Sequence, residues 1–462
     1  MSILIKNGVL VTAEEMAEKD ILLEGEKIIA VKDEFLSGEI PEKTKIIDTE
    51  GKYIFPGIID AHTHYFMKSP PDNVTADDFY SGSISAAFGG VTTFIDYAEQ
   101  QKGHSIIEAF INRQEEAKGN AAIDYSLHQS VCSLYHNIKE DLEELKDGGV
   151  SSLKLFTTYK EDGSMLDKGN WLELLKMSRD LKLLVTVHAE DDEMIDQIKI
   201  KYKDREEFPP YYHTFLRPPE VEYSAIKEIG DMAKLLDMPI YIAHLSSKEG
   251  YRALKEIKKN RGKIFAETTP HYLLLTEDLL KKEDAQKYFM TPPLRNKEDN
   301  EALWEALKDK YISVIDTDHC SYTTEQKFLS SNCLGILAGI PGSETLLPLA
   351  YSYGVGRGYF NVKNMVNLLS TNPAKIFGLY PEKGSLEVGT DADLVIFDPK
   401  KEIIISDSGQ HTAAGYTPFS GFKVKGYPIT TILRGKIIVN NNRFYGERGG
   451  GKFLKGKESA LY

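Results

Sequence analysis

Two histidines stand two residues apart at the end of an apolar run. His62 and His64 follow the pair Ile58-Ile59. Residues at positions i and i+2 of a β-strand project to the same side, so both imidazoles could bind one metal ion. Two ordinary polar residues at a strand end would give the same pattern, and the motif alone leaves both interpretations open.

Two further histidines stand at the ends of other apolar runs. His188 follows Leu184–Val187 and His244 follows Ile240–Ala243. A single histidine is more often an ordinary core or surface residue than a metal ligand. Four of the 11 histidines in the chain, however, end apolar runs in the same way. The arrangement of the four, and no single one of them, indicates a metal site.

A lysine and an aspartate occupy two more such runs. Lys154 lies inside Ser152–Phe156, and Asp318 follows Val314–Thr317. A lysine within a buried strand is costly unless it is paired or neutral. A salt bridge from Lys154 to Asp318 or another acid would satisfy it, and the residues alone favour this explanation. The alternative is a neutral amine that has bound CO₂ as a carbamate, whose two oxygens can bridge two metal ions.

These side chains require a scaffold that brings several strand ends together. Eight short apolar runs lie in the middle of the chain: 54–59, 91–95, 121–127, 152–156, 183–187, 239–243, 263–266 and 312–315. Helix-like stretches lie between them: 76–88, 105–118, 139–146, 169–181, 220–236, 248–260 and 297–308. Strands alternating with helices indicate an α/β fold, and eight strands predict a (β/α)8 TIM barrel, whose function gathers at the carboxyl ends of the strands. An open doubly wound sheet would give a similar pattern.

Both ends of the chain are rich in short strand-like runs. They include Ile3–Ile5 and Ile28–Val31 near the start, and Asp393–Asp398 and Thr431–Val439 near the end. We expect residues 1–55 and 386–440 to form one small β-sandwich domain and residues 56–385 to form the barrel. Residues 441–462 read as a C-terminal tail that contacts a neighbouring subunit.

Composition restricts the kind of partner. The 462 residues carry a net charge of −14 and are 41% hydrophobic, so we expect a folded protein with neither a nucleic-acid-binding face nor an affinity for anionic membranes. The apolar runs are far shorter than the ~20 residues of a membrane span. The first residues do not resemble a signal peptide, and three cysteines cannot form a disulfide framework, so we expect a cytoplasmic protein.

The combination of motifs resembles the amidohydrolase superfamily, and within it the dihydropyrimidinases and hydantoinases, over nearly the whole chain. The matching segments are Asp60–His64, Thr75–Phe79, Phe88–Thr93, Leu153–Phe156, Val187–Glu190, Thr291–Arg295, Thr317–Cys320, Gly389–Val395 and Gly421–Gly426. The resemblance implies a barrel with a β-sandwich assembled from both termini, a site for two Zn²⁺ ions, and a homotetramer or homodimer.

The resemblance also assigns roles to individual residues. It implies that His62, His64 and Asp318 hold one zinc and that His188 and His244 hold the other. Carboxylated Lys154 and a hydroxide would bridge the two ions, so the resemblance reverses the preference for a salt bridge.

Further residues would act on the substrate. Tyr159 matches the tyrosine that such enzymes direct at the reacting carbonyl, and Asp318 would pass a proton from the hydroxide to the leaving nitrogen. Thr291, Ala338 and Gly339 match segments that contact the substrate ring. His271 and His319 would orient ligands or contact the ring, although buried core residues are an equal alternative.

The implied reaction is hydrolysis of a dihydropyrimidine, such as dihydrouracil or dihydrothymine, or of a 5-substituted hydantoin to an N-carbamoyl amino acid. Tyr65, Phe66 and Met67 stand where dihydroorotases place polar residues that include an arginine, which disfavours a ring with a carboxylate. Ala338 stands where hydantoinases usually have asparagine, so a contact there must be through the main chain or the natural ring differs. The alternatives are an allantoinase, a dihydroorotase-like enzyme, or a non-catalytic scaffold that resembles dihydropyrimidinase.

Overall fold

Eight parallel strands form a closed barrel in the middle of the chain. The computed structural model describes residues 2–69, 73–202 and 205–462. In sheet order the strands are β15 (Val314–Ile315), β14 (Ile264–Thr268), β13 (Ile240–Ile242), β12 (Leu184–His188), β11 (Ser152–Phe156), β10 (Asp124–Ser130), β9 (Val91–Ala98) and β6 (Ile58–Thr63). The ring closes where Thr63 bridges His319 and the His64 N–H donates to the His319 carbonyl at 2.8 Å. The predicted (β/α)8 barrel is confirmed.

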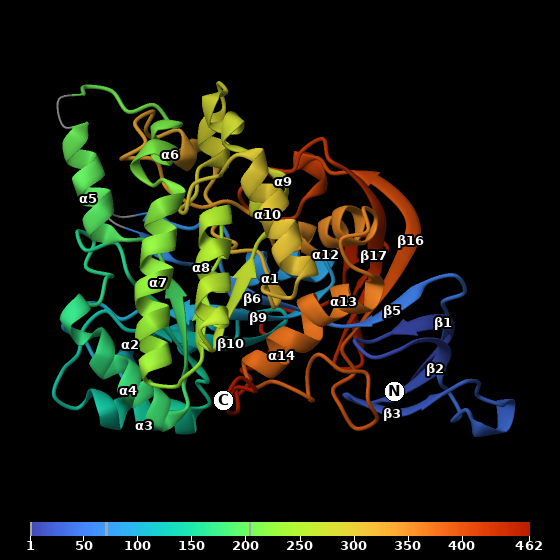
Figure 1. The fold of residues 1–462 in the computed structure, drawn as a ribbon. Coiled ribbons are helices and arrows are strands. Elements are labelled where there is room, and N and C mark those ends of the chain that lie inside the picture. Colours follow the sequence, from blue (N-terminus) through green and yellow to red (C-terminus); the bar gives the residue numbers. More distant parts are fainter. Residues whose placement is uncertain (1, 70–72, 203–204) are drawn as a thin grey trace.

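Helices surround the barrel and separate its strands (Figure 1). They are α1 (Phe79–Phe88), α2 (Ile106–Ala117), α3 (Ile138–Gly148), α4 (Trp171–Leu181), α5 (Asp192–Lys201), α6 (Tyr212–Leu216), α7 (Pro219–Leu235), α8 (Lys248–Lys259), α9 (Pro270–Leu274), α10 (Lys297–Lys308), α11 (Thr324–Lys327), α12 (Leu346–Leu349), α13 (Val362–Val366) and α14 (Asn372–Ile376). Each of the seven helix-like stretches overlaps one of them. The sequence patterns did not reveal α5, α6, α9 or the helices after β15.

Strands from both termini form one nine-stranded sheet beside the barrel (Figure 1). They are β1 (Ser2–Val11), β2 (Met16–Glu24), β3 (Lys27–Lys32), β4 (Lys45–Asp48), β5 (Tyr53–Pro56), β16 (Leu394–Ile404), β17 (Lys423–Leu433), β18 (Lys436–Asn440) and β19 (Arg443–Phe444). β5 pairs with both β1 and β16, so the two ends of the chain share one β-layer. Their apolar side chains form one core, which includes Ile5, Ile54, Leu394 and Ile432. The predicted β-domain built from both termini is confirmed.

Two predicted strands are wrong in their extent. The run 54–59 is divided at Gly57 between β5 of the terminal sheet and β6 of the barrel. A Cβ at Gly57 would lie 2.0 Å from Thr92 Oγ1, so the close approach to β9 requires glycine there. The run 431–439 is a hairpin of β17 and β18, because Arg434 and Gly435 both adopt positive φ at its turn.

The last residues lie against their own barrel. The Tyr125 N–H donates to the Lys452 carbonyl at 3.0 Å, and the Leu454 N–H donates to the Tyr125 carbonyl at 2.7 Å. Buried Lys383 joins the nearby layers through Asp124 at 2.7 Å and Asp393 at 2.6 Å. The domain boundaries and the inter-subunit role of residues 441–462 remain predictions.

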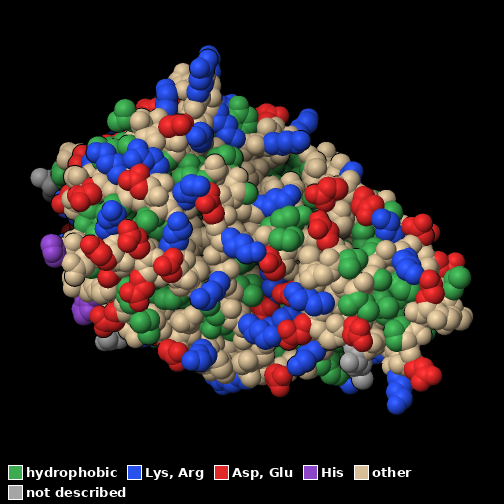
Figure 2. All heavy atoms as spheres, turned by 90° about the horizontal axis from the view of Figure 1, so that it is seen from below, with side chains coloured by type: hydrophobic (Ala, Val, Ile, Leu, Met, Phe, Trp, Pro, Cys, Tyr) green, Lys and Arg blue, Asp and Glu red, His purple; other side chains and the backbone are tan. Residues whose placement is uncertain are grey.

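The surface carries charges of both signs. Figure 2 shows Lys and Arg interspersed with Asp and Glu on the face seen from below. Within the described part of the chain, no helix is both long enough and apolar enough to cross a bilayer.

Candidate metal and substrate site

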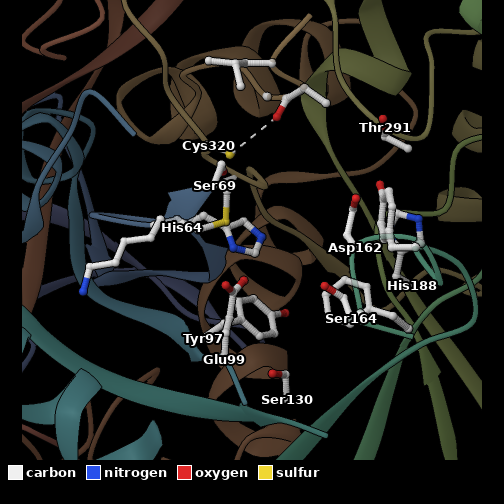
Figure 3. A pocket seen from close by; sticks show the side chains of 18 of the residues that line it. His64, Ser69, Tyr97, Glu99, Ser130, Asp162, Ser164, His188, Thr291 and Cys320 are labelled. Atoms are coloured by element: carbon white, nitrogen blue, oxygen red, sulfur yellow. Dashed lines mark hydrogen bonds between the residues drawn. The ribbon is translucent and has the colours of Figure 1, made fainter. Parts of the chain in front are cut away.

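All ten of the predicted site residues line one cavity of about 1260 Å³. The cavity lies at the carboxyl ends of the barrel strands, where Figure 3 shows His64, Tyr97 and Glu99 on one side of the view and His188 and Thr291 on the other. The ten residues are His62, His64, Lys154, Tyr159, His188, His244, Thr291, Asp318, Ala338 and Gly339. They come from seven separate segments, which the barrel brings to one mouth.

The first histidine pair meets the predicted aspartate. His62 Nε2 and His64 Nε2 each lie 3.3 Å from Asp318 Oδ1. Ligand atoms of the three residues all lie within 4.8 Å of one another, which makes them a possible metal-binding group. Asp318 has φ 48°, an uncommon backbone conformation for a non-glycine residue at a strand end. The surrounding fold therefore holds this carboxylate in a defined direction.

The other two histidines lie beside the first pair. The ring centroids of His188 and His244 are 4.5 Å apart, and those of His62 and His244 are 5.4 Å apart. Burial lowers the pKa of His62, His188 and His244, which keeps these imidazoles neutral. Neutral imidazole is the form that binds a metal ion.

Carboxylates behind the histidines orient them. His62 Nδ1 lies 2.5 Å from Glu267 Oε1, which also accepts from the His244 N–H at 3.2 Å. His188 Nε2 lies 2.8 Å from Glu190 Oε2. A carboxylate on one ring nitrogen fixes the tautomer and leaves the other nitrogen free to act as a ligand.

Lys154 is buried without a partner. Its side chain is 1% exposed, and Nζ has neither a hydrogen bond nor an ion pair among the described residues. The salt bridge that the residues alone favoured is therefore not formed. Burial lowers the pKa of Lys154 to about 8, which raises the fraction of neutral amine that can react with CO₂.

The unsatisfied buried atoms fit a metal site. His64 Nδ1, His244 Nδ1 and Lys154 Nζ have no hydrogen-bond partner in the described part of the structure. A buried polar atom without a partner usually costs 1–3 kcal/mol. The Lys154 amine lies in the same cavity as the Asp318 carboxylate and the neutral imidazoles, and these groups together can bind a cation; for His64 the nitrogen near Asp318 is Nε2.

Tyr159 faces this group from the loop after β11. Its ring centroid lies 5.1 Å from that of His188, and the Arg217 guanidinium lies 5.2 Å from the centre of its ring. Burial raises the pKa of Tyr159 well above its usual value, so the hydroxyl stays protonated and can donate. Thr291 Oγ1, on the same wall, lies 3.1 Å from His213 Nε2.

Charged groups on the cavity wall are largely paired. Arg217 Nη1 lies 2.6 Å from Glu190 Oε2, and Arg113 contacts Asp96 and Glu116. Among the described residues, each arginine that lines the cavity thus already has a carboxylate partner. The wall also carries Phe66 and Met67, so it offers a ring substituent apolar contact and no unpaired arginine.

Two candidate histidines lie outside the cavity lining. His319 Nε2 lies 3.0 Å from Asp77 Oδ2, and its Nδ1 accepts from the N–H groups of Gly342 and Ser343 at 3.2 Å. His271 is buried, and its Nε2 has no described partner. Neither residue lines the cavity, so neither is placed to contact a ring there. His319 instead accepts hydrogen bonds from the backbone at residues 342–343.

Sequence reasoning missed several acids and one arginine of this site. Glu267 directly follows the predicted apolar run 263–266, and Glu99 directly follows strand β9. The four histidines were identified by the same pattern. Glu190 lies two residues after His188, at the end of the matching segment Val187–Glu190. Arg217 comes from the segment between α6 and α7, and nothing in its local sequence indicates that it reaches the cavity.

Comparisons with known proteins agree with this geometry. The model of the amidohydrolase family matches residues 53–438. The chain is 37% identical to the D-hydantoinase of Ralstonia pickettii and 38% identical to that of Rhizobium radiobacter, covering 98% of this chain and 99% of each relative. The crystal structure of dihydropyrimidinase from Brevibacillus agri is similar at 35% identity with a TM-score of 0.96, and each chain is covered completely. The L-hydantoinase of Arthrobacter aurescens is similar at 26% identity with a TM-score of 0.88, over 98% of this chain and 99% of that one.

Proposed function

The chain belongs to the amidohydrolase family, and within it to the hydantoinases and dihydropyrimidinases, and on that premise we propose that it opens a dihydropyrimidine or 5-substituted hydantoin ring to an N-carbamoyl amino acid. It is an enzyme of the cyclic amide hydrolase class. The observation that carries the proposal is the cavity in which four histidines, Asp318 and Lys154, an amine without a partner among the described residues, converge.

The donor set would hold two zinc ions. His62, His64 and Asp318 would hold one ion, His188 and His244 the other, and Lys154 as its carbamate would supply an oxygen to each. Two bound zinc ions would supply a nucleophile at neutral pH and polarise the amide carbonyl. Glu267 and Glu190 would keep the imidazoles in the required orientation.

Asp318 and Tyr159 would carry out the proton transfers. Asp318 would accept the proton of the attacking water and deliver it to the ring nitrogen as the C–N bond breaks. The Tyr159 hydroxyl would donate a hydrogen bond to the oxygen of the former carbonyl as it becomes negative. The Arg217 guanidinium, which is paired with Glu190, lies against the Tyr159 ring on this side of the cavity.

The cavity wall favours a ring without a carboxylate. Both arginines of the wall are paired with acids, and Phe66 and Met67 add apolar surface. A carboxylate on the ring would find no arginine there that lacks an acidic partner among the described residues. Dihydrouracil, dihydrothymine and substituted hydantoins therefore fit better than dihydroorotate, and allantoin is the second candidate. A scaffold without catalysis would have no need of the complete ligand set.

We also propose that the enzyme is cytoplasmic and forms a homotetramer or homodimer. The three cysteines are free and buried, which suits a reducing compartment. Light scattering on the purified enzyme measures the number of chains.

A substrate panel tests the proposed function. Zinc-loaded enzyme is incubated with dihydrouracil, hydantoin, allantoin and dihydroorotate, and the N-carbamoyl products are measured. We expect turnover of the first two rings and little of dihydroorotate. No turnover of dihydrouracil or hydantoin would contradict the proposal, and a strong preference for allantoin would support the second candidate.

A further inference from the structure

One acid of the cavity wall has no partner, and the proposed chemistry does not use it. Glu99 directly follows β9, and Figure 3 shows it across the view from Thr291. Glu99 is exposed while its neighbours Ala98 and Gln100 are buried, so the surface that it exposes belongs to the cavity. Among the described residues, its carboxylate forms neither a hydrogen bond nor an ion pair.

The next residue fixes the backbone that carries Glu99. The Gln100 N–H donates to Ser130 Oγ at 2.9 Å, and the Gln100 side-chain amide donates to the His104 carbonyl at 2.8 Å. The side-chain oxygen of Gln100 accepts from the Cys132 N–H at 2.8 Å. These bonds join the segment after β9 to the end of β10, so Glu99 is presented to the cavity from a fixed point.

The arginine whose charge acts on Glu99 is fully occupied by other groups. Arg113 has five N–H donors, as every guanidinium does. They donate to the carboxylates of Asp96 and Glu116 and to the carbonyls of Tyr65 and Phe66, and Asp96 accepts two of these bonds. Arg113 therefore has no donor left for Glu99.

The remaining positive groups do not neutralise Glu99 either. His64 and Lys154 also act on its charge, but both would bind metal ions. Lys102 lines the cavity further along the same loop and forms no ion pair with Glu99. Burial raises the pKa of Glu99, because its carboxylate has lost water without gaining a partner. A cation that arrives with the ligand would supply this partner.

The neighbouring segment of the wall is apolar. β6 and β9 are adjacent strands, and Thr63 pairs with Asp96 at their carboxyl ends. The residues after β6, which include Phe66 and Met67, therefore leave the barrel beside the segment that carries Glu99, and all three line the cavity. This wall can bury an alkyl chain and leave a charged group at the end of the chain for the carboxylate.

We propose that Glu99 is a specificity-determining residue that binds a cationic group, an ammonium or a guanidinium, at the end of an alkyl substituent on the ring. This inference rests on the proposed function, because the ring must bind in this cavity. The substrate class is then a hydantoin with an aminoalkyl or guanidinoalkyl group on the ring carbon C5. Its product is an N-carbamoyl amino acid with a cationic side chain.

Matched pairs of rings test the proposal. Zinc-loaded wild type and Glu99→Gln are assayed at about pH 7.5, where an alkylamine is protonated, on hydantoins that carry aminoalkyl or hydroxyalkyl groups of equal length at C5. The series has two to four methylene groups in the chain, so that one length fits the distance to the carboxylate. In the wild type we expect the best aminoalkyl ring to exceed its hydroxyalkyl partner by about 10-fold in kcat/KM, mainly through KM. In Glu99→Gln this ratio should fall to about 1.

Two further variants show whether the charge at position 99 sets the preference. Glu161→Gln is the matched control, since Glu161 also lines the cavity but its side chain is 80% exposed, and the ratio should change by less than about 3-fold. Glu99→Lys should prefer 5-(2-carboxyethyl)hydantoin to the aminoalkyl rings, because the sign of the charge is reversed. Zinc per chain and the melting temperature of each variant show that the metal site and the fold are retained.

Equal kcat/KM for the paired rings at every chain length in the wild type would overturn the inference, as would a preference that survives in Glu99→Gln. In both cases the wild type still opens hydantoin rings, so the proposed function stands. If the wild type opens neither hydantoin nor dihydrouracil, the proposed function fails, and this inference falls with it.

Discussion

Lys154 is the residue whose environment departs most from what a lysine requires. It is 1% exposed, its amine has no partner among the described residues, and Tyr97 and Phe156 present their rings to Nζ at 5.0 and 5.4 Å. A carbamate on this nitrogen, bound to two cations, would remove the unsatisfied donor. Lys154 would then bind the metal ions as a carbamate and would not be an unpaired ammonium in the protein interior.

Lys154→Ala should abolish zinc binding and activity, because the bridging oxygens are lost. Zinc per chain is measured by elemental analysis, and a short carboxylic acid such as propionate should partly restore both zinc and activity by filling the space. Lys160→Ala is the matched control, since Lys160 lines the same cavity but is exposed, and this variant should keep its zinc. Full activity of Lys154→Ala would refute the carbamate bridge.

Tyr159→Phe should lower kcat by about 10²-fold and change KM much less, because the hydroxyl acts when negative charge develops on the carbonyl oxygen. Steady-state kinetics on dihydrouracil measure both constants. A raised KM at unchanged kcat would show instead that the hydroxyl contributes only to binding the ring.

The site could be predicted where each residue carries its own local signal. His62, His64, His188 and His244 follow apolar runs, and the barrel brings such strand ends together. The carboxylates that pair with these residues could not be predicted. Glu267 contacts His62 across 205 residues of sequence. Arg217 comes from the loop before α7, and the direction of its side chain depends on tertiary packing. Whether Lys154 is paired is likewise decided by the tertiary structure.

At the scale of elements, the sequence pattern predicted which segments are strands and which are helices, but it did not predict the residues at which they begin and end. The apolar run at 54–59 crosses from the terminal sheet into the barrel, and only the close contact of Gly57 with β9 marks the change. The turn at Arg434-Gly435 interrupts a run whose other residues are typical of a strand, so the sequence pattern did not reveal it. Helix α5 and the short helices after β15 lack a long amphipathic pattern, so they depend on tertiary contacts.

Lys383 joins elements that are far apart in the sequence. It lies within 3.0 Å of Asp124 at the start of β10 and of Asp391 and Asp393 just before β16, and its side chain is 2% exposed. Lys383→Met should lower the free energy of unfolding by about 3–5 kcal/mol, since buried carboxylates lose their cation. Urea unfolding measures this, with the exposed Lys436→Met as the control that should change it by less than about 0.5 kcal/mol. Equal stability of the two variants would contradict this role.

At the scale of the whole molecule, buried neutral histidines make stability depend on pH. Burial lowers the pKa of His128 and His213 to about 3 and that of His271 to about 4. In the unfolded chain these groups have a pKa of about 6.5, so the unfolded state binds more protons below that pH. Stability should therefore fall as pH falls from about 6.5 to about 4, by about 1.4 kcal/mol per pH unit for each histidine.

Urea unfolding of the zinc-free protein between pH 4.5 and 6.5 measures this slope. His128→Asn removes one of the three groups, so its slope should be shallower by one proton. An unchanged slope in this variant would show that His128 is protonated in the folded state.

The central claim is that the barrel mouth opens a cyclic amide with two metal ions held by His62, His64, Lys154, His188, His244 and Asp318. The most direct measurement is the rate of dihydrouracil ring opening as zinc is added stepwise to metal-free enzyme in bicarbonate buffer. We expect no ring opening without zinc and a rate that stops rising at two zinc ions per chain. Ring opening by metal-free enzyme, or a rate that is already maximal at one zinc per chain, would contradict the account.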